Sequence, residues 1–181
     1  HTGEMYVCGY NWSGNLGTGT THNQRTLEKV ESPLLDCVSV SGHTVGVAHD
    51  GTVWGCGTNV DNTLGDFPQN FQILTMTQIP NFVDIKSIAT GTNSTVLLGN
   101  DGQVTIMGRM TTRRFVNITE TTSPRILPIP VKIQQISAGV IHCLMLDVKG
   151  YVYSYGSCST DALGREGQEC ESTLGRIEGL S

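Results

Sequence analysis

The 181-residue sequence lacks the features of several common classes of protein. No apolar run is long enough to cross a membrane, which argues against a membrane-spanning helix. No stretch of a dozen residues shows helical periodicity with capping residues, so helices should be few or absent. Basic residues are scarce, because 11 Lys and Arg stand against 16 Asp and Glu, with a pI near 5.4. This balance disfavours direct binding to nucleic-acid phosphates or to anionic membranes.

Motifs for catalysis and for metal binding are missing as well. There is no glycine-rich phosphate loop of the G-x-G-x-x-G or P-loop type, and no G-x-S-x-G nucleophile elbow. The six cysteines form no C-x-x-C pair, which argues against structural zinc. Cys8 and Cys56 stand at matching places in a repeat and are predicted to be small buried residues of a reduced, intracellular protein. We therefore expect no enzymatic activity, no metal and no cofactor.

What the sequence does contain is a repeat. A glycine, five residues of β-forming character and a second glycine occur four times at intervals of roughly 50 residues, a period typical of propellers and solenoids. The second glycines are predicted to stand where the chain turns or where backbones approach closely. These glycines are Gly9, Gly57, Gly108 and Gly156. The repeats divide a single domain, residues 1–181, at about 1–50, 51–101, 102–149 and 150–181.

Each repeat reads as a series of short strands. Asp50-Gly51 and Asp101-Gly102 lie between apolar runs and predict hairpin turns in which both central residues take a positive φ. After the turn, alternate residues should face opposite sides of the strand. One side carries Met5, Val53, Val104 and Val152, and the other carries Tyr6, Trp54, Thr105 and Tyr153. Both sides are apolar in most copies, so an all-β fold of stacked sheets is predicted.

Two longer patterns make the repeat specific. The first is the run Gly9-Tyr-Asn-Trp-Ser-Gly-Asn-Leu-Gly17, and the second is an Ile- and Val-rich strand after Pro130 that leads to Gly139 and His142. Together they resemble the repeat of the regulator of chromosome condensation family over essentially the whole chain. The resemblance implies a β-propeller of four-stranded blades, usually seven around a central channel. The copies here amount to about three and a half blades.

A half ring would leave unpaired strand edges, which natural sheets avoid. Three arrangements would close it: more sequence in a longer protein, a second copy of the chain, or a partner that covers the open ends. The sequence starts without Met and stops in mid-repeat. We therefore favour a segment of a longer protein.

The third copy departs from the pattern. Where the other copies have Leu-Gly, it has Phe115-Val116, preceded by Arg109, Arg113 and Arg114. One interpretation is a docking patch for an acidic partner, because arginine and aromatic residues are enriched at binding hot spots. The other, which we favour, is a blade that has drifted, with the arginines in a solvated loop.

Histidine also recurs in the repeat. His43 and His142 stand at equivalent positions, eight residues before the next repeat glycine, while the second copy has Ser94 there. Because serine replaces histidine in one copy, a shared catalytic or metal-binding role is disfavoured. The resemblance implies a structural role at a strand end between blades.

These observations predict a non-enzymatic propeller scaffold that binds other proteins, within a larger protein or assembly in the cytoplasm or nucleus. The family resemblance adds an alternative, guanine-nucleotide exchange on a Ran-like small GTPase, although no residue here can be matched to the loops that perform exchange. Further alternatives are a regulatory domain of a multidomain ligase or kinase and a component of the cilium or cytoskeleton. Among relatives that sense ultraviolet light, clustered tryptophans are required, and this chain has only Trp12 and Trp54.

Overall fold

The structure, a computed structural model, describes residues 4–40, 42–67, 71–110, 123–157, 161–165 and 174–180. Within these ranges the chain is almost entirely β, and the single helical element described is a short 3-10 turn, η1 (Val60–Asn62). No helix in these ranges is long and apolar enough to span a membrane. The expectation that helices would be few is confirmed.

The strands form four antiparallel sheets, which we number as blades in chain order. Blade 1 has β1 (Met5–Gly9) and β2 (Gln24–Val30). Blade 2 has β3 (Leu34–Val40), β4 (His43–Ala48), β5 (Val53–Thr58) and β6 (Gln72–Gln78). Blade 3 has β7 (Ile85–Gly91), β8 (Ser94–Gly99), β9 (Val104–Gly108) and β10 (Arg125–Ile126). Blade 4 has β11 (Ile133–Ala138), β12 (His142–Asp147), β13 (Val152–Gly156) and β14 (Gly175–Arg176).

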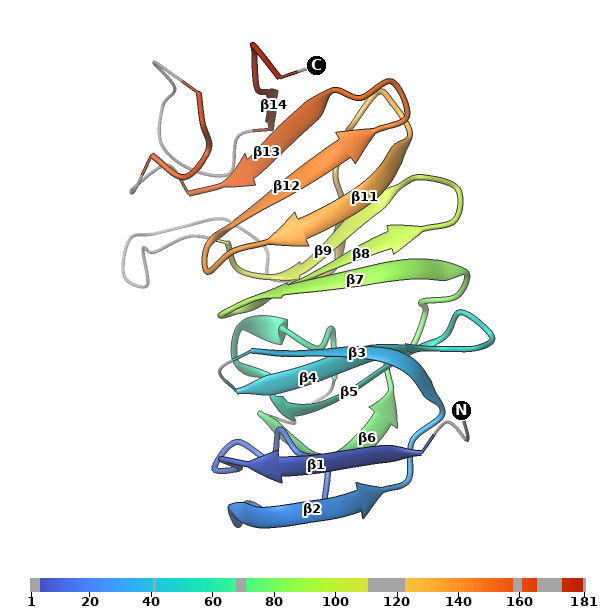
Figure 1. The fold of residues 1–181 in the computed structure, drawn as a ribbon, viewed down its shortest axis with the longest axis vertical. Helices are drawn as coiled ribbons and strands as arrows, with labels where there is room; N and C mark the ends of the chain where they lie inside the picture. Colours follow the sequence, from blue (N-terminus) through green and yellow to red (C-terminus); the bar gives the residue numbers. More distant parts are fainter. Residues whose placement is uncertain are drawn as a thin grey trace.

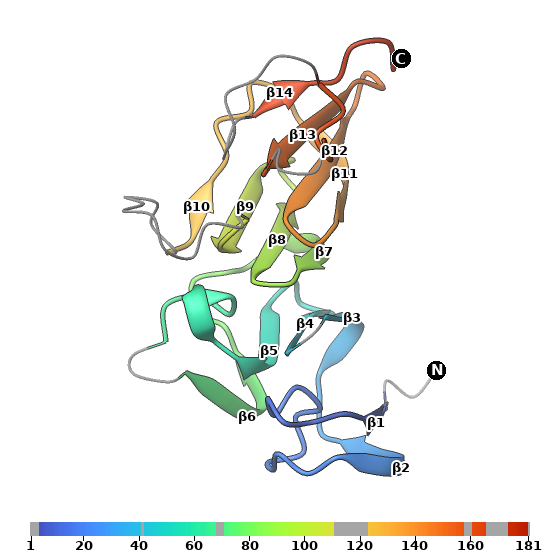
Figure 2. The ribbon, with the colours of Figure 1, turned by 90° about the vertical axis from the view of Figure 1, so that its left-hand side faces the viewer.

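The blades follow one another along an arc, with blade 1 and blade 4 at its two ends (Figure 1). The first strands of the complete blades, β3, β7 and β11, lie on one side of the arc, and the last strands β6 and β10 lie on the opposite side (Figure 2). The described strands form a partial β-propeller of three four-stranded blades and one two-stranded blade, as predicted. Each blade is offset from the glycine-to-glycine repeat, because that repeat begins at the hairpin between the second and third strands.

The hydrophobic core lies between the blades. In β8, Val96 and Leu98 belong to the cluster shared with blade 4, whereas Leu97 belongs to the cluster shared with blade 2. In β9, Ile106 faces blade 4 and Met107 faces blade 2 in the same way. Successive side chains of a strand point to opposite faces, so a sheet covered on both sides needs apolar residues at successive positions. The prediction that both faces would be covered is confirmed.

The hairpin turns differ in detail from the prediction. Gly51 and Gly102 have φ of +77° and +86°, but the aspartates before them do not adopt positive φ. Gly51 N–H donates to the carbonyl of Ala48, so the glycine follows a tight turn instead of forming its centre. Asp50 accepts hydrogen bonds from the backbone and hydroxyl of Thr52, which holds this geometry.

Candidate functional site

In the described part of the chain, β1 and β5 are each followed by a loop that leads to the last strand of the same blade, β2 or β6. We call the side of the molecule on which these loops lie the loop face, and it is turned toward the viewer in Figure 2. A buried asparagine organises the loops of blades 1 and 2. Asn11 Oδ1 accepts the N–H of Leu16 at 2.9 Å, and Asn59 Oδ1 accepts the N–H of Leu64 at 2.8 Å. The buried leucines then anchor the loops on the core.

A threonine of the next blade secures each of these loops. Thr44 in β4 donates its hydroxyl hydrogen to the carbonyl oxygen of Asn15 at 2.7 Å. Thr95 in β8 donates in the same way to the carbonyl oxygen of Thr63, also at 2.7 Å. Because each bond joins one blade to the preceding one, the loop face is held in a fixed arrangement across blades 1 to 3.

His43 is buried beside one of these bonds. Its Nε2 lies 3.2 Å from Thr95 Oγ1, and since that hydroxyl gives its hydrogen to Thr63, the imidazole is the donor. Burial lowers the pKa of His43 to about 4, so the ring is neutral at pH 7. His142, its repeat equivalent in blade 4, is half-buried, and Ser94 in blade 3 is buried.

The junction between blades 3 and 4 lacks both the loop asparagine and the threonine that secures the loop at the other two junctions. Met110, which is fully buried, stands where the other two loops have their asparagine. Cys143, buried in blade 4, stands at the position of Thr44 and Thr95, and burial raises the pKa of its thiol to about 12. An apolar pair thus replaces the polar pair at the junction of blades 3 and 4, which distinguishes this junction from the other two.

The arginines predicted in the third copy are only partly described. Arg109 is half-buried, and its guanidinium lies 3.5 Å from the carboxylate of Asp61 in blade 2. Its backbone N–H donates to the carbonyl oxygen of Asn93 at 2.7 Å. Arg113, Arg114 and Phe115 lie outside the described residues. Within the described part, Arg109 links two blades instead of extending into solvent.

The repeat glycines occupy backbone positions that other residues rarely adopt. The φ values of Gly9, Gly57, Gly108 and Gly156 are +108°, +103°, +78° and +132°. A Cβ at any of the last three would overlap a backbone carbonyl oxygen of the neighbouring strand's turn. Glycine avoids both the conformational strain and the overlap.

Exposed aromatic side chains occur in the loop-face segments of blades 1 and 2. Tyr10 and Trp12 stack with ring centroids 5.5 Å apart and are 56% and 69% exposed. Phe71, at the start of the segment leading into β6, is 77% exposed. The side chain of Gln72 donates to the carbonyl oxygen of Trp12 at 3.0 Å, which joins the two segments. We call Tyr10, Trp12 and Phe71 the aromatic patch.

The sequence contained a signal for part of this patch. Tyr10 and Trp12 flank Asn11, whose side chain turns inward to hold its own loop. In blade 2, Val60 follows Asn59 and is also exposed. The residue that follows the inward-turned asparagine is therefore exposed in both loops, so an aromatic residue at this position predicts an exposed ring.

Other reactive groups of the described residues do not assemble into a site. Among them, no three His, Cys, Asp or Glu side chains are close enough together to hold a metal ion. Cys56 is buried, as predicted, but Cys8 is exposed, which corrects the prediction made for it. The reason is positional: Cys56 Sγ lies 3.3 Å from the carbonyl oxygen of Asn15 in the preceding blade, and no described blade precedes β1.

Four-stranded blades in an arc, joined by loops of this kind, define a partial β-propeller. Comparison with known proteins gives its relationships, although no family model matches the chain. A mouse RCC1-like G exchanging factor-like protein is 25% identical over 97% of this chain and 40% of its own length. A bovine secretion-regulating guanine nucleotide exchange factor is 26% identical over 84% of this chain and 35% of its own length. The crystal structure of human WBSCR16 superposes with a TM-score of 0.83 at 19% identity, over 97% of this chain and 48% of that one.

Several of the sequence relatives and structural neighbours are RCC1-type proteins, in agreement with the resemblance of this chain's repeat to the regulator of chromosome condensation family. The chain spans less than half the length of the two sequence relatives and about half of the solved chain.

Proposed function

We propose that this propeller is a protein-binding scaffold whose loop face docks a partner protein. The aromatic patch is the observation that carries the proposal. Tyrosine and tryptophan are the residues most enriched at interface hot spots, and a rigid framework lowers the entropy lost on binding. Asn11 and the Thr44 hydroxyl supply that framework for the loop that carries Trp12. The basic segment with Arg113, Arg114 and Phe115 belongs to the third-copy loop and is proposed as an extension of the same face.

The experiment compares variants of the aromatic patch with a variant of the opposite end of the strands. Trp12→Ala/Phe71→Ala removes two exposed rings, while Val148→Ala truncates an exposed side chain in the hairpin between β12 and β13. Partners purified with the wild-type chain should be lost with the double variant, by roughly tenfold or more in affinity, and retained with the control. Equal recovery by both variants would refute docking through this patch.

A second function is favoured by the relatives. The mouse and bovine proteins are named as exchange factors, and such an activity would also operate through protein contacts. We propose it as the alternative, with a small GTPase as the partner. Loss of labelled GDP from a panel of Ran-like GTPases tests it, with the Val148→Ala variant as the control for folding. If the chain accelerates GDP release and Trp12→Ala abolishes the effect, exchange and docking use the same surface. If GDP release is not accelerated, the exchange proposal is refuted and the scaffold proposal is unaffected.

We further propose that the chain acts as part of a longer propeller, in the nucleus or the cytoplasm. Its short share of each relative supports the first point, and the unpaired outer edge of β1 among the described strands is consistent with it. A native mass for the 181-residue chain well above 19.5 kDa would instead favour closure by a second copy.

A further inference from the structure

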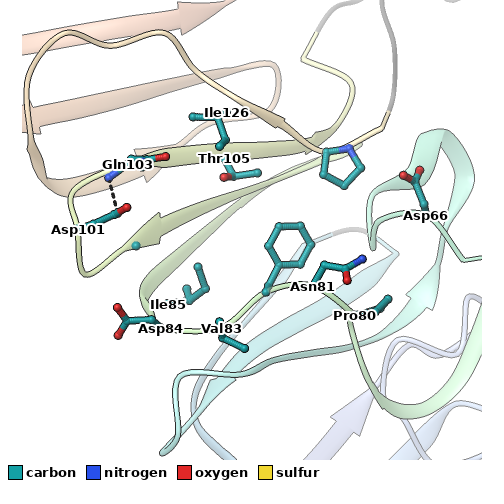
Figure 3. A pocket seen from close by; sticks show the side chains of 13 residues that line it. Asp66, Pro80, Asn81, Val83, Asp84, Ile85, Asp101, Gln103, Thr105 and Ile126 are labelled. Carbon is teal, nitrogen blue, oxygen red and sulfur yellow. Dashed lines mark hydrogen bonds between the residues drawn. The ribbon is translucent and has the colours of Figure 1, made fainter.

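A cleft opens between blades 2 and 3 and extends from Asp66, in the loop between β5 and β6, to Asp84 and Asp101 at the opposite end of the strands (Figure 3). Its volume is about 450 Å³, within the range of pockets that bind ligands. The segment 80–85 between β6 and β7 forms one wall. The hairpin between β8 and β9, together with β10, forms the other.

One residue of the repeat accounts for the space. Thr105 lines the cleft and stands at the repeat position that is Tyr6, Trp54 and Tyr153 in the other copies. In blade 4, Tyr153 is half-buried and packs against the core shared by blades 3 and 4. A small side chain replaces this aromatic ring in blade 3, so the outer part of the junction between blades 2 and 3 is left open.

The lining combines apolar surface with negative charge. Val83 and Ile126 are 69% and 62% exposed, although both are apolar. Asp84 and Asp101 lie at one end of the cleft and Asp66 at the other (Figure 3). None of the described residues that line the cleft is basic. An occupant that is positively charged at its ends and apolar between them would therefore match the cleft.

The three carboxylates are held in place by neutral donors. Asn100 donates to Asp84 Oδ1 at 2.7 Å, and the backbone of Gln103 donates to Asp101 Oδ1 at 2.9 Å. Ser123 donates to Asp66 Oδ1 at 3.1 Å. Each of these bonds leaves the carboxylate charge uncancelled. Because the carboxylates lie at opposite ends and form no metal-binding group among the described residues, a metal ion is a poor match.

We propose that this cleft binds an extended basic segment of a partner protein, with lysine or arginine side chains at the two acidic ends and an apolar side chain on Val83 and Ile126. Long basic side chains suit both features, since their methylene stems cover apolar surface while their charged heads reach carboxylates. The inference rests on the proposed function of a protein-binding scaffold, but it uses a surface separate from the aromatic patch.

The first test selects random dodecapeptides on phage with the 181-residue chain and then measures the enriched peptide in synthetic, fluorescent form by anisotropy. We expect enriched sequences in which lysine or arginine flanks an apolar residue. Asp84→Asn/Asp101→Asn should weaken the synthetic peptide roughly tenfold. Each substitution keeps one acceptor oxygen, which can retain the hydrogen bond made by Oδ1, and asparagine tolerates the positive φ of Asp84, which is 58°. Glu28→Gln/Glu31→Gln, at exposed positions in and beside β2, changes the net charge equally and should leave binding intact.

A second variant fills the cleft without removing charge. Thr105→Tyr restores the ring of the other copies, on a strand where aromatic residues are favoured, and should abolish binding of the synthetic peptide while thermal unfolding stays cooperative. Enrichment of acidic or neutral peptides, or unchanged affinity in both cleft variants, would overturn the proposal, as would displacement of the peptide by single-stranded RNA with higher affinity. The Thr105→Tyr variant should still bind partners that dock on the loop face. If it does, a negative result for the cleft overturns this inference without overturning the proposed scaffold function.

Discussion

Gly57 and Gly9 allow the role of the repeat glycine to be separated into two physical parts. Both have nearly the same backbone conformation, with φ of +103° and +108°. A Cβ on Gly57 would overlap the carbonyl oxygen of Gly42 and lie 2.7 Å from the Cα of His43. A Cβ on Gly9 would have no described atom within 4 Å. Alanine at Gly9 therefore adds only conformational strain, whereas alanine at Gly57 adds strain and overlap.

The expected magnitudes follow from these two terms. Placing a residue with a Cβ at such a φ costs about 1–3 kcal/mol. Forcing backbone apart in a packed region costs about 1–3 kcal/mol more. Gly57→Ala should therefore reduce the free energy of unfolding by about 4 kcal/mol and Gly9→Ala by about 2 kcal/mol. For a chain of this length, each kcal/mol lowers Tm by roughly 2–4 °C.

The assay is urea unfolding followed by tryptophan fluorescence, with thermal melts as a second measure. Trp54 lies in β5, the strand that contains Gly57, and is half-buried, so it reports on this blade. Equal destabilisation by the two substitutions would show that overlap with Gly42 is relieved without cost, and that conformation alone selects glycine. A loss smaller in Gly57→Ala than in Gly9→Ala would refute the reasoning entirely.

Further predictions concern the junctions between blades. Gly156→Val should destabilise by more than the 1–3 kcal/mol of strain alone, because its Cβ would overlap the carbonyl oxygen of Ile141, and thermal melts identical to wild type would contradict this. His43 has a pKa of about 4 when folded and about 6.5 when unfolded, so the unfolded chain binds more protons between these values and stability falls as pH falls through this window. Between pH 7 and pH 5 the loss is about 2 kcal/mol in urea titrations, and His43→Gln should remove this part of the pH dependence. Thr95→Val should cost about 3 kcal/mol in the same titrations, since it removes the hydrogen bonds of the Thr95 hydroxyl to the His43 imidazole and to the Thr63 carbonyl, and a cost below about 1 kcal/mol would show that the junction relaxes.

Much of the architecture follows from short-range patterns in the chain. Strand lengths, hairpin positions and blade count depend on residues that are close in sequence, such as the glycine that follows each apolar strand. The hairpin of blade 4 shows the limit of this reasoning. It lacks the Asp-Gly pair, and Asp147, three residues before Gly150, accepts the backbone N–H groups of Lys149 and Tyr151 instead. In blade 4 the hairpin is therefore held by an aspartate that stands two positions earlier than the aspartate of the Asp-Gly pairs.

The surfaces were harder to predict, because they depend on neighbouring blades. Cys8 and Cys56 occupy the same repeat position, but one is exposed and the other buried, since only Cys56 has a described blade in front of it. The cleft likewise requires that Thr105 of blade 3 face the segment that follows blade 2. Sequence shows that Thr105 breaks an aromatic series, and only the packing of two blades shows that the missing ring leaves open space.

The sequence by itself determined a glycine-punctuated β-propeller of about three and a half blades, because turns and alternating strands are encoded within a few residues of one another. The tertiary structure alone decided that His43, Thr95 and Thr63 form one hydrogen-bonded chain across blades. It also decided which aromatic rings remain in solvent and where three aspartates surround apolar surface. These properties arise between blades, where residues distant in sequence meet, and no local pattern specifies which side chains will face each other across that junction.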